Sequence, residues 1–312
     1  MVRARGPVFH GKEAAAVVWL SSAALFFVMF RVALDNSSRS TRGGSGISNS
    51  IKRSDLYDKM ARDLDEHGPR FLEAGATSQS LSLSDIFSLK DGSVVPILKV
   101  ADPPVRANVL YLSPEYAGHL LKAVKNIFLP YFDKEIWFQN TSLYHFSMFH
   151  ASHHLEPVPA TPNEIEAEVG AVKDVSVHLC PLKIVLDRVV LTSTGVILGL
   201  WQVTSGTDPV TIRGELRKAL PRAPQKQLYD PILLHTSFAR LLGSPKLSSG
   251  AMGKNSDLLA FFHNLVGQVN KELHGFEAVV SELWYVEEFD VLALALNGRI
   301  EARKFHLGCS KD

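Results

Sequence analysis

The sequence predicts an α+β domain that is preceded by a membrane-spanning helix. From about residue 81 onward, short runs of strand character are mixed with two amphipathic helices, without a regular alternation of strand and helix. Near the N-terminus, 17 consecutive residues carry no charge. We therefore expect helices lying on antiparallel sheets, behind a single membrane anchor.

The apolar N-terminal stretch runs from Ala14 to Phe30, and Val32, Ala33 and Leu34 extend it past Arg31. This length is close to the lower limit for a helix that spans a bilayer. A cleaved or organellar targeting segment is the main alternative, although no A-x-A cleavage site follows Phe30, and a soluble helix is another. Basic residues are nearly balanced across the stretch, so the side of the membrane and the organelle stay open.

The chain divides by composition into four parts. We expect an N-terminal tail at residues 1–13, a transmembrane anchor at 14–34, a flexible stem at 35–80 and the globular domain at 81–312. The stem begins rich in Ser, Gly and Arg, which bury little surface, and contains one helix at 54–74 capped by Ser54.

The elements of the domain are expected from hydrophobic periodicity and capping residues. Two amphipathic helices are predicted at 114–128 and 257–273, with Ser113 and Ser256 as caps, and a short helix at 216–220. Strands are predicted at 94–100, 107–112, 143–149, 175–179, 182–190, 196–203, 232–241, 278–286, 291–296 and 299–307.

Charge and cysteine content restrict the partners. Lys and Arg number 33 against 32 acidic residues, so no basic face for a long duplex is evident, and a small or terminal phosphate ester is easier to accommodate. We expect a monomer that needs no cofactor. The only cysteines, Cys180 and Cys309, form no multi-disulfide framework and fix no redox compartment, and Cys180 is most simply a buried small residue. Asn36 and Asn140 begin glycosylation sequons that are usable only in a lumenal domain.

Two segments share the pattern His-x-Ser-hydrophobic. They begin at His145 and His235, are 90 residues apart, and each lies in a run of strand character. Residues two apart on a strand face the same side, about 6.6 Å apart, so Ser147 and Ser237 should face one cleft together with the histidines. Two imidazoles can give and take protons near neutral pH, and two hydroxyls can bind the oxygens of a phosphodiester.

These motifs resemble those of the two-histidine, LigT-like phosphoesterase superfamily, in particular its RNA ligase/cyclic nucleotide phosphodiesterase group. The segment at 145–148 fits the family pattern fully, whereas Thr236 departs from its second position. Arg240 matches the basic residue that often follows the second motif, and residues 195–203 resemble the strand between the motifs. The resemblance covers about residues 90–305. It implies a bilobal fold of two antiparallel β lobes with flanking helices, and metal-independent chemistry on 2′,3′-cyclic phosphates.

The resemblance implies His145 and His235 as catalytic acid and base, with Ser147, Ser237 and Arg240 binding phosphate. Trp201 is a candidate for stacking on a base, as are Tyr144 and Trp284, although such aromatic residues more often lie in the core or at its rim. The histidines at 150, 153 and 154 suggest a metal cluster, but they lack a set of ligands with the right spacing, and a solvated loop explains them better.

The sequence therefore predicts a membrane-anchored, metal-independent phosphodiesterase that acts on cyclic-phosphate nucleotides or RNA ends. One alternative is a module of the same fold that binds a nucleotide or RNA end without turnover. Another is a lumenal type II transferase, suggested by an anchor followed by a stem, although residues 287–290 supply no Asp-x-Asp motif. The sequence leaves open which histidine is the acid and which bond is cleaved.

Overall fold

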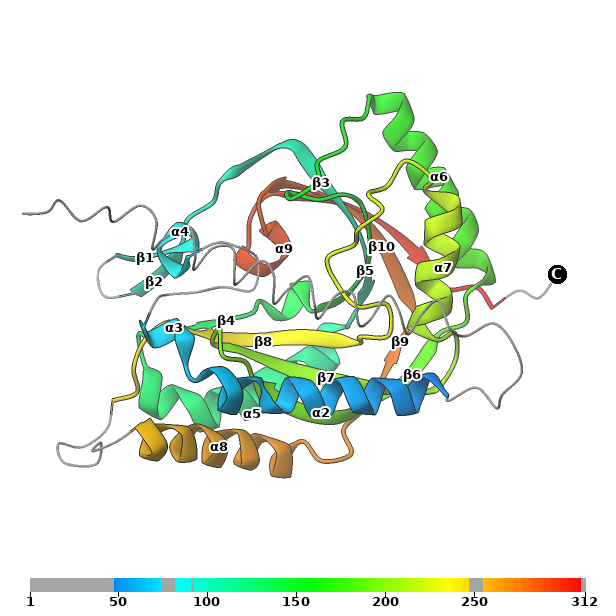
Figure 1. Ribbon diagram of the computed structural model, residues 1–312. Helices are drawn as coiled ribbons and strands as arrows, with labels where there is room; N and C mark the ends of the chain where they lie inside the picture. The colour runs from blue at the N-terminus through cyan, green and yellow to red at the C-terminus, as the bar shows by residue number, and fades with distance from the viewer. Residues whose placement is uncertain (1–47, 74–81, 91–92, 247–254, 310–312) are drawn as a thin grey trace, which may run out of the picture. The chain divides into compact units, whose positions relative to one another are not determined.

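The computed structural model describes residues 48–73, 82–90, 93–246 and 255–309, which belong to one compact unit beginning at Ser48 (Figure 1). None of the helices in these ranges combines the length and the apolar character needed to cross a bilayer. The predicted membrane span at 14–34 and the Asn36 sequon lie outside the described residues.

The first of two large sheets contains four antiparallel strands. Its order is β11-β10-β3-β5, and β5 forms one edge. The strands are β3 (Val100–Tyr111), β5 (His145–Ser152), β10 (Glu282–Asp290) and β11 (Ile300–His306).

The second large sheet contains five antiparallel strands in the order β4-β8-β7-β6-β9. The strands are β4 (Ile136–Phe138), β6 (Leu182–Leu191), β7 (Val196–Ser205), β8 (His235–Leu241) and β9 (Glu277–Val280). Strand β5 of the first sheet and β8 of the second contact each other, which brings the two predicted motifs to one place (Figure 1).

Helices cover both sheets. On the second sheet, α5 (Pro114–Phe132) and α8 (Asn255–Glu272) pack against each other, and α2 (Asn49–His67) packs on β6 and β7 through a separate apolar cluster. On the first sheet, α7 (Pro209–Ala219) contacts β5 and α6 (Pro162–His178) contacts β10 and β11. The short elements are α3 (Arg70–Glu73), α4 (Leu83–Ile86), β1 (Phe87–Lys90), β2 (Ser93–Pro96), η1 (Thr141–Leu143) and α9 (Ala293–Leu296).

This arrangement confirms the α+β class, with antiparallel sheets and flanking helices, and corrects two predicted strands. Residues 175–179 form the end of α6, which begins at a capping box between Thr161 and Glu164, with Pro162 in the first turn. The apolar run at 175–179 has strand character when it is taken alone, but it continues a helix that begins at Pro162. Residues 291–296 turn into α9 because Leu292 takes a left-handed conformation that ends β10.

The boundary predicted at residue 81 is also wrong, since α2 belongs to the folded unit. The helix begins after Ser48 rather than Ser54 and ends at His67, earlier than predicted. Tyr57 and Arg53 are almost fully buried against the second sheet. The polar composition of this segment predicts a flexible stem. The helix is nevertheless packed on the sheet, because its buried side presents an arginine and a tyrosine as well as aliphatic residues.

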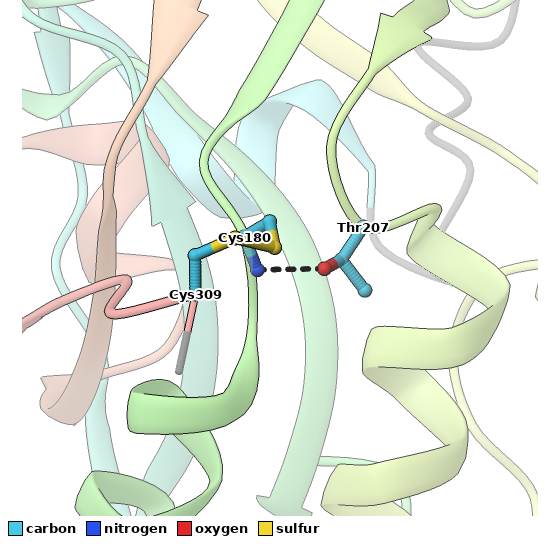
Figure 2. The surroundings of a disulfide bond; sticks show 3 residues. All are labelled: Cys180, Thr207 and Cys309. Carbon is cyan, nitrogen blue, oxygen red and sulfur yellow. Dashed lines mark hydrogen bonds between the residues drawn. A yellow bond between two sulfur atoms is a disulfide. The ribbon is translucent and has the colours of Figure 1, made fainter. Parts of the chain in front are cut away.

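The two cysteines are joined to each other. Cys180, which follows α6, forms a disulfide with Cys309 near the C-terminus (Figure 2). Cys180 is half-buried rather than buried, so its interpretation as a small core residue is corrected.

Candidate active site

The first motif lies on β5, where a β-bulge determines which side chains face away from the main core. Val109 on β3 pairs with Ser147 and Asn108 pairs with Phe149, so Met148 is an extra residue. Met148 and Phe149 both enter the main core. His145, Ser147 and also His150 therefore share the opposite face and line one pocket.

The second motif lies on β8 and has the same bulge at the same position. Leu198 on β7 pairs with Ser237 and Ile197 pairs with Ala239, so Phe238 is the extra residue. Phe238 and Ala239 are buried in the main core, whereas the residues on either side of this pair are half-buried. As a result, Arg240 shares a face with His235 and Ser237.

The two strands thus present equivalent sets of polar side chains. Each set holds a histidine, a serine two residues later and a basic residue three further along: His150 on β5 and Arg240 on β8. A regular strand would turn the basic residue of each set into the core, because side chains alternate between the faces. The prediction identified Arg240 from the resemblance and missed His150, although the spacing of five from the motif histidine is the same.

The tautomer of His145 follows from its hydrogen bond. Its Nδ1 atom lies 2.8 Å from the backbone carbonyl oxygen of Leu143, two residues earlier. A carbonyl can only accept, so Nδ1 carries a proton. The Nε2 atom of the neutral ring is then an acceptor and can take up a proton.

Arg213 on α7 joins the two motif strands. Its Nε atom donates to the Met148 carbonyl at 3.0 Å, and Nη2 donates to the Ser147 carbonyl at 2.9 Å, both on β5. It also donates to Leu233 at 2.7 Å and to Pro231 at 2.6 Å, just before β8. Burial lowers the pKa of Arg213 to about 10, so the guanidinium remains charged at neutral pH.

Helix α2 supports the start of β8 from the other side. The hydroxyl of Tyr57 lies 2.9 Å from the Leu234 carbonyl and 3.2 Å from the Leu234 amide, and 2.7 Å from the Trp201 carbonyl. Arg53 donates to the Ile232 carbonyl at 2.9 Å and pairs with Asp208 at 2.8 Å. The residues that precede His235 are therefore held by a helix about 180 positions earlier in the chain.

Burial keeps the histidines of the groove neutral. It lowers the pKa of His235 to about 3, and the charges of Arg213 and of a protonated His145 act in the same direction. It lowers the pKa of His150 to about 3 as well, again with a contribution from His145. For His145 burial is also the main cause of a lowered pKa, partly offset by the Leu143 hydrogen bond. Strands β5 and β8 contact each other, which places the two motif histidines on neighbouring strands.

The pocket extends from the first motif across the first sheet. Its lining combines polar side chains with small and aliphatic ones: Val105, Ala107, His145, Ser147, His150, His154, Leu228, Tyr229, Glu288, Leu292, Leu294 and Ala295. The lining includes one carboxyl group, that of Glu288 on β10, which the sequence motifs do not indicate. Burial raises the pKa of Glu288 to about 7, against the effect of hydrogen bonds from the Leu294 and Ala293 amides.

Tyr229 lies between this pocket and the second motif. Its ring centroid is 4.9 Å from that of His235 and 6.3 Å from that of His150. His235, Ser237 and Arg240 do not line the pocket themselves. The first motif is thus open to the pocket, whereas Tyr229 lies beside the histidine of the second.

Arg240, on the same face of β8 as His235 and Ser237, has part of its guanidinium unpaired. Among the described residues, its Nη1 atom is one of four buried side-chain nitrogen or oxygen atoms without a hydrogen-bond partner. Burial lowers the pKa of Arg240 to about 10, so it too keeps its charge at neutral pH. A buried N–H without a partner in the protein is available to an oxygen of a bound anion.

Trp201 does not reach the pocket, which corrects its assignment to substrate binding. The side chain is fully buried, packs against Phe146 and Phe276, and donates from Nε1 to the Thr236 hydroxyl at 3.0 Å. Tyr144 is equally buried, and its ring stacks on that of Phe238. Thr236, the residue between the two polar positions of the second motif, thus accepts a hydrogen bond from Trp201 in the core.

The interpretation of the histidines at 150, 153 and 154 as a solvated loop is wrong. His150 belongs to β5, and both it and His153 are buried. The Nε2 atom of His153 lies 3.0 Å from the Lys226 carbonyl, while its Nδ1 atom accepts from the Glu156 amide. Within the described ranges, no three His, Cys, Asp or Glu side chains are grouped as a metal site requires.

Comparison with known proteins returns similar folds and no similar sequences. No protein-family model matches the chain, and no curated protein matches it. Among solved structures, TT0787 of Thermus thermophilus is similar with a TM-score of 0.43 and 12% identity, over 65% of this chain and 98% of the other. E. coli LigT complexed with 3′-AMP is similar with a TM-score of 0.40 and 12% identity, over 68% and 99%.

A third similar structure, titled a phosphoesterase, has a TM-score of 0.41 and 10% identity, over 66% of this chain and 99% of the other. At these values the likeness does not decide what the groove binds, which depends on the chain's own side chains.

Proposed function

We propose that the groove between β5 and β8 hydrolyses 2′,3′-cyclic phosphates of nucleotides or RNA ends. The observation that carries this proposal is the matched bulge on the two motif strands, which turns a histidine, a serine and a basic residue of each strand toward the same face. Two proton-transfer groups and several phosphate-binding groups are the set that hydrolysis of a phosphodiester needs.

The histidines exchange the protons of the reaction. One neutral imidazole takes a proton from a water molecule, whose oxygen bonds to phosphorus. The other imidazole, protonated, gives its proton to the ribose oxygen as the bond from phosphorus to that oxygen breaks. The product is a phosphomonoester with one free ribose hydroxyl. For His145 the exchanging atom is Nε2, since Leu143 holds the proton on Nδ1.

The negative charge of the bound substrate favours protonation of one imidazole by the solvent. In the free protein burial lowers the pKa of both catalytic histidines. A phosphodiester bound between them favours the charged form of a neighbouring imidazole and raises its pKa. The protonated acid thus forms as the substrate binds.

The other polar groups of the groove bind the phosphate. The hydroxyls of Ser147 and Ser237 hydrogen-bond its non-bridging oxygens, and Arg240 supplies its unpaired Nη1–H. His150 occupies the equivalent position on β5 and contributes a neutral N–H rather than a charge. None of these contacts requires a metal, so we expect activity to survive EDTA.

Tyr229 takes the role that the sequence suggested for Trp201. Its ring lines the pocket beside His150 and His235, where it can stack on a base. We expect Tyr229→Ala to raise KM for nucleotides more than it lowers kcat, because stacking acts on the bound substrate and not on the reacting atoms.

We also propose that residues 14–34 attach the protein to a membrane, and this part of the proposal rests on the sequence alone. Full-length protein should stay in the membrane pellet through a carbonate wash. Deletion of residues 1–47, which leaves α2 whole, should release an active domain. Full-length protein that stays in the supernatant would contradict the anchor.

The function is tested by turnover of 2′,3′-cyclic mononucleotides and short RNAs with a cyclic-phosphate end, with and without EDTA. The His145→Ala/His235→Ala protein serves as the blank, and His274→Ala, at an exposed turn, is the matched histidine control. Binding of these ligands without turnover would favour a non-catalytic module. Activity that is lost in EDTA and restored by a divalent cation would contradict the mechanism.

A further inference from the structure

The disulfide between Cys180 and Cys309 lies in backbone that is fixed on both sides. The Cys180 amide donates to the Thr207 hydroxyl at 2.7 Å, and the Thr207 amide lies 3.3 Å from the Cys180 carbonyl (Figure 2). The Cys309 amide donates to the Leu179 carbonyl at 3.0 Å. Both cysteines are therefore placed by main-chain hydrogen bonds and not only by their sulfur atoms.

The C-terminal segment before Cys309 is seated against α6 with little clearance. The Gly308 amide donates to the Ser176 carbonyl at 3.0 Å, and the Leu307 amide donates to Ser281 at 2.9 Å. A Cβ atom at Gly308 would lie 2.6 Å from the carbonyl oxygen of Val177, closer than side chains approach. A glycine at this position lets the chain bring the second cysteine to the first.

A second, independent feature is the Asn140-Thr141-Ser142 sequon. It forms the turn at η1, between β4 and β5, and both Asn140 and Ser142 are exposed. The Oδ1 atom of Asn140 accepts the Ser142 amide at 2.9 Å. This hydrogen bond does not involve Nδ2, the atom to which an N-linked glycan is attached. It holds the Asn140 side chain at the surface.

We propose that the domain resides in an oxidising, glycosylating compartment, with Cys180 joined to Cys309 and an N-linked glycan on Asn140. Structural disulfides persist outside the reducing cytosol, and the sequon is usable only on the same side. The disulfide and the sequon therefore both indicate the non-cytosolic side of the membrane. Taken together with the proposed anchor at residues 14–34, on which this step rests, they place the N-terminal tail in the cytosol and the active site in the lumen or the exterior.

The proposal is tested on full-length protein expressed in eukaryotic cells, with Asn36→Gln in every variant so that one sequon remains. Thiols are blocked at lysis, and the protein is then denatured, reduced and labelled with a maleimide-polyethylene glycol. We expect two labels per chain after reduction and none without it. Cys180→Ser should leave one thiol that is blocked at lysis, and thus no label in either case.

The glycan is read out as a mobility shift that peptide-N-glycosidase removes. Ser142→Ala should abolish the shift, whereas Ser142→Thr should keep it. Both variants retain Asn140 and the backbone amide that bonds to it, so a difference between them reports the sequon and not the turn. Two thiols blocked at lysis, or the absence of a shift that depends on Ser142, would overturn the proposal.

Discussion

The two motif strands are alike in local geometry and differ in what holds them. On β5 and on β8 the same bulge follows the serine and turns the same three positions to the groove. The histidine of β5 is oriented from two residues away, by the Leu143 carbonyl. The residues leading to the histidine of β8 are held by Arg53 and Tyr57 of α2.

This comparison shows that the motif and its placement have different origins. A short pattern of polar and apolar residues is enough to form the bulge, because two consecutive apolar side chains enter the core. Placing two such strands beside each other takes distant parts of the chain. The guanidinium of Arg213 donates hydrogen bonds to two carbonyls of the first motif and to two carbonyls just before the second.

The largest effects are expected at the histidines, which test whether the motifs contribute equally. His145→Ala or His235→Ala removes one proton-transfer group and should lower kcat roughly 10²- to 10⁴-fold. Ser147→Ala and Ser237→Ala should lower it less, because each removes one hydrogen bond. Steady-state kinetics on a 2′,3′-cyclic mononucleotide measures both. If kcat fell tenfold or less for only one of the two histidine variants, the two motifs would not contribute equally to the reaction.

Arg213→Met should weaken both motifs at once. It leaves four backbone carbonyls without their donor, and buried acceptors that lose a partner cost about 1–3 kcal/mol each. We expect the free energy of unfolding to fall by about 3 kcal/mol or more, measured by urea denaturation, together with a lower kcat. Arg217→Met is the matched control, since Arg217 on the same helix donates to the Pro224 and Gln225 carbonyls and contacts β5 through the ring of Phe149, with its guanidinium 4.9 Å from the ring centroid. Equal losses in the two variants would refute the special place of Arg213.

Stability should fall with acid because the folded state keeps buried imidazoles neutral. The unfolded pKa of His150 is about 6.5 and burial lowers the folded value to about 3, so between these values the unfolded chain binds more protons. From pH 7 to pH 5 this linkage removes about 2 kcal/mol for one such group. His150→Asn should flatten the dependence, whereas Arg240→Gln on the equivalent position should not. Identical pH slopes in wild type and His150→Asn would disprove this account of His150.

Tyr57→Phe should affect one motif only. The lost hydroxyl contacts Trp201 and Leu234, next to the second motif, so we expect a decrease in stability of about 1–3 kcal/mol. In NMR spectra of the variant the ring signals of His235 should shift more than those of His145. Tyr116→Phe on α5 is the control. Shifts of equal size at both histidines would mean that α2 supports the groove as a whole.

The sequence alone predicted what depends on neighbouring residues. The α+β class, the helix at the start of α5 with Ser113 before it, and the strand character of both motifs follow from local periodicity. What it missed depends on contacts between distant residues. The role of α2, the four carbonyls of Arg213 and the carboxyl of Glu288 in the pocket leave no local pattern.

His150 stands between these two cases. Its spacing of five from His145 repeats that of Arg240 from His235, so a pattern was present in the sequence. The bulge that makes the spacing meaningful became visible only from the register of β5 against β3. Trp201 shows the opposite error, since an aromatic residue on the strand between the motifs is predicted at the site although β7 turns it to the core.

The central claim is that His145 and His235 act as a pair on one phosphoryl group, and a double-mutant cycle on kcat tests it most directly. If the pair works as a unit, His145→Ala/His235→Ala should lower kcat by clearly less than the product of the two single losses. The pH profile of the wild type should be bell-shaped, and each single variant should lose one of its two limbs. A double variant whose loss equals the product, with both limbs retained in each single variant, would contradict the claim.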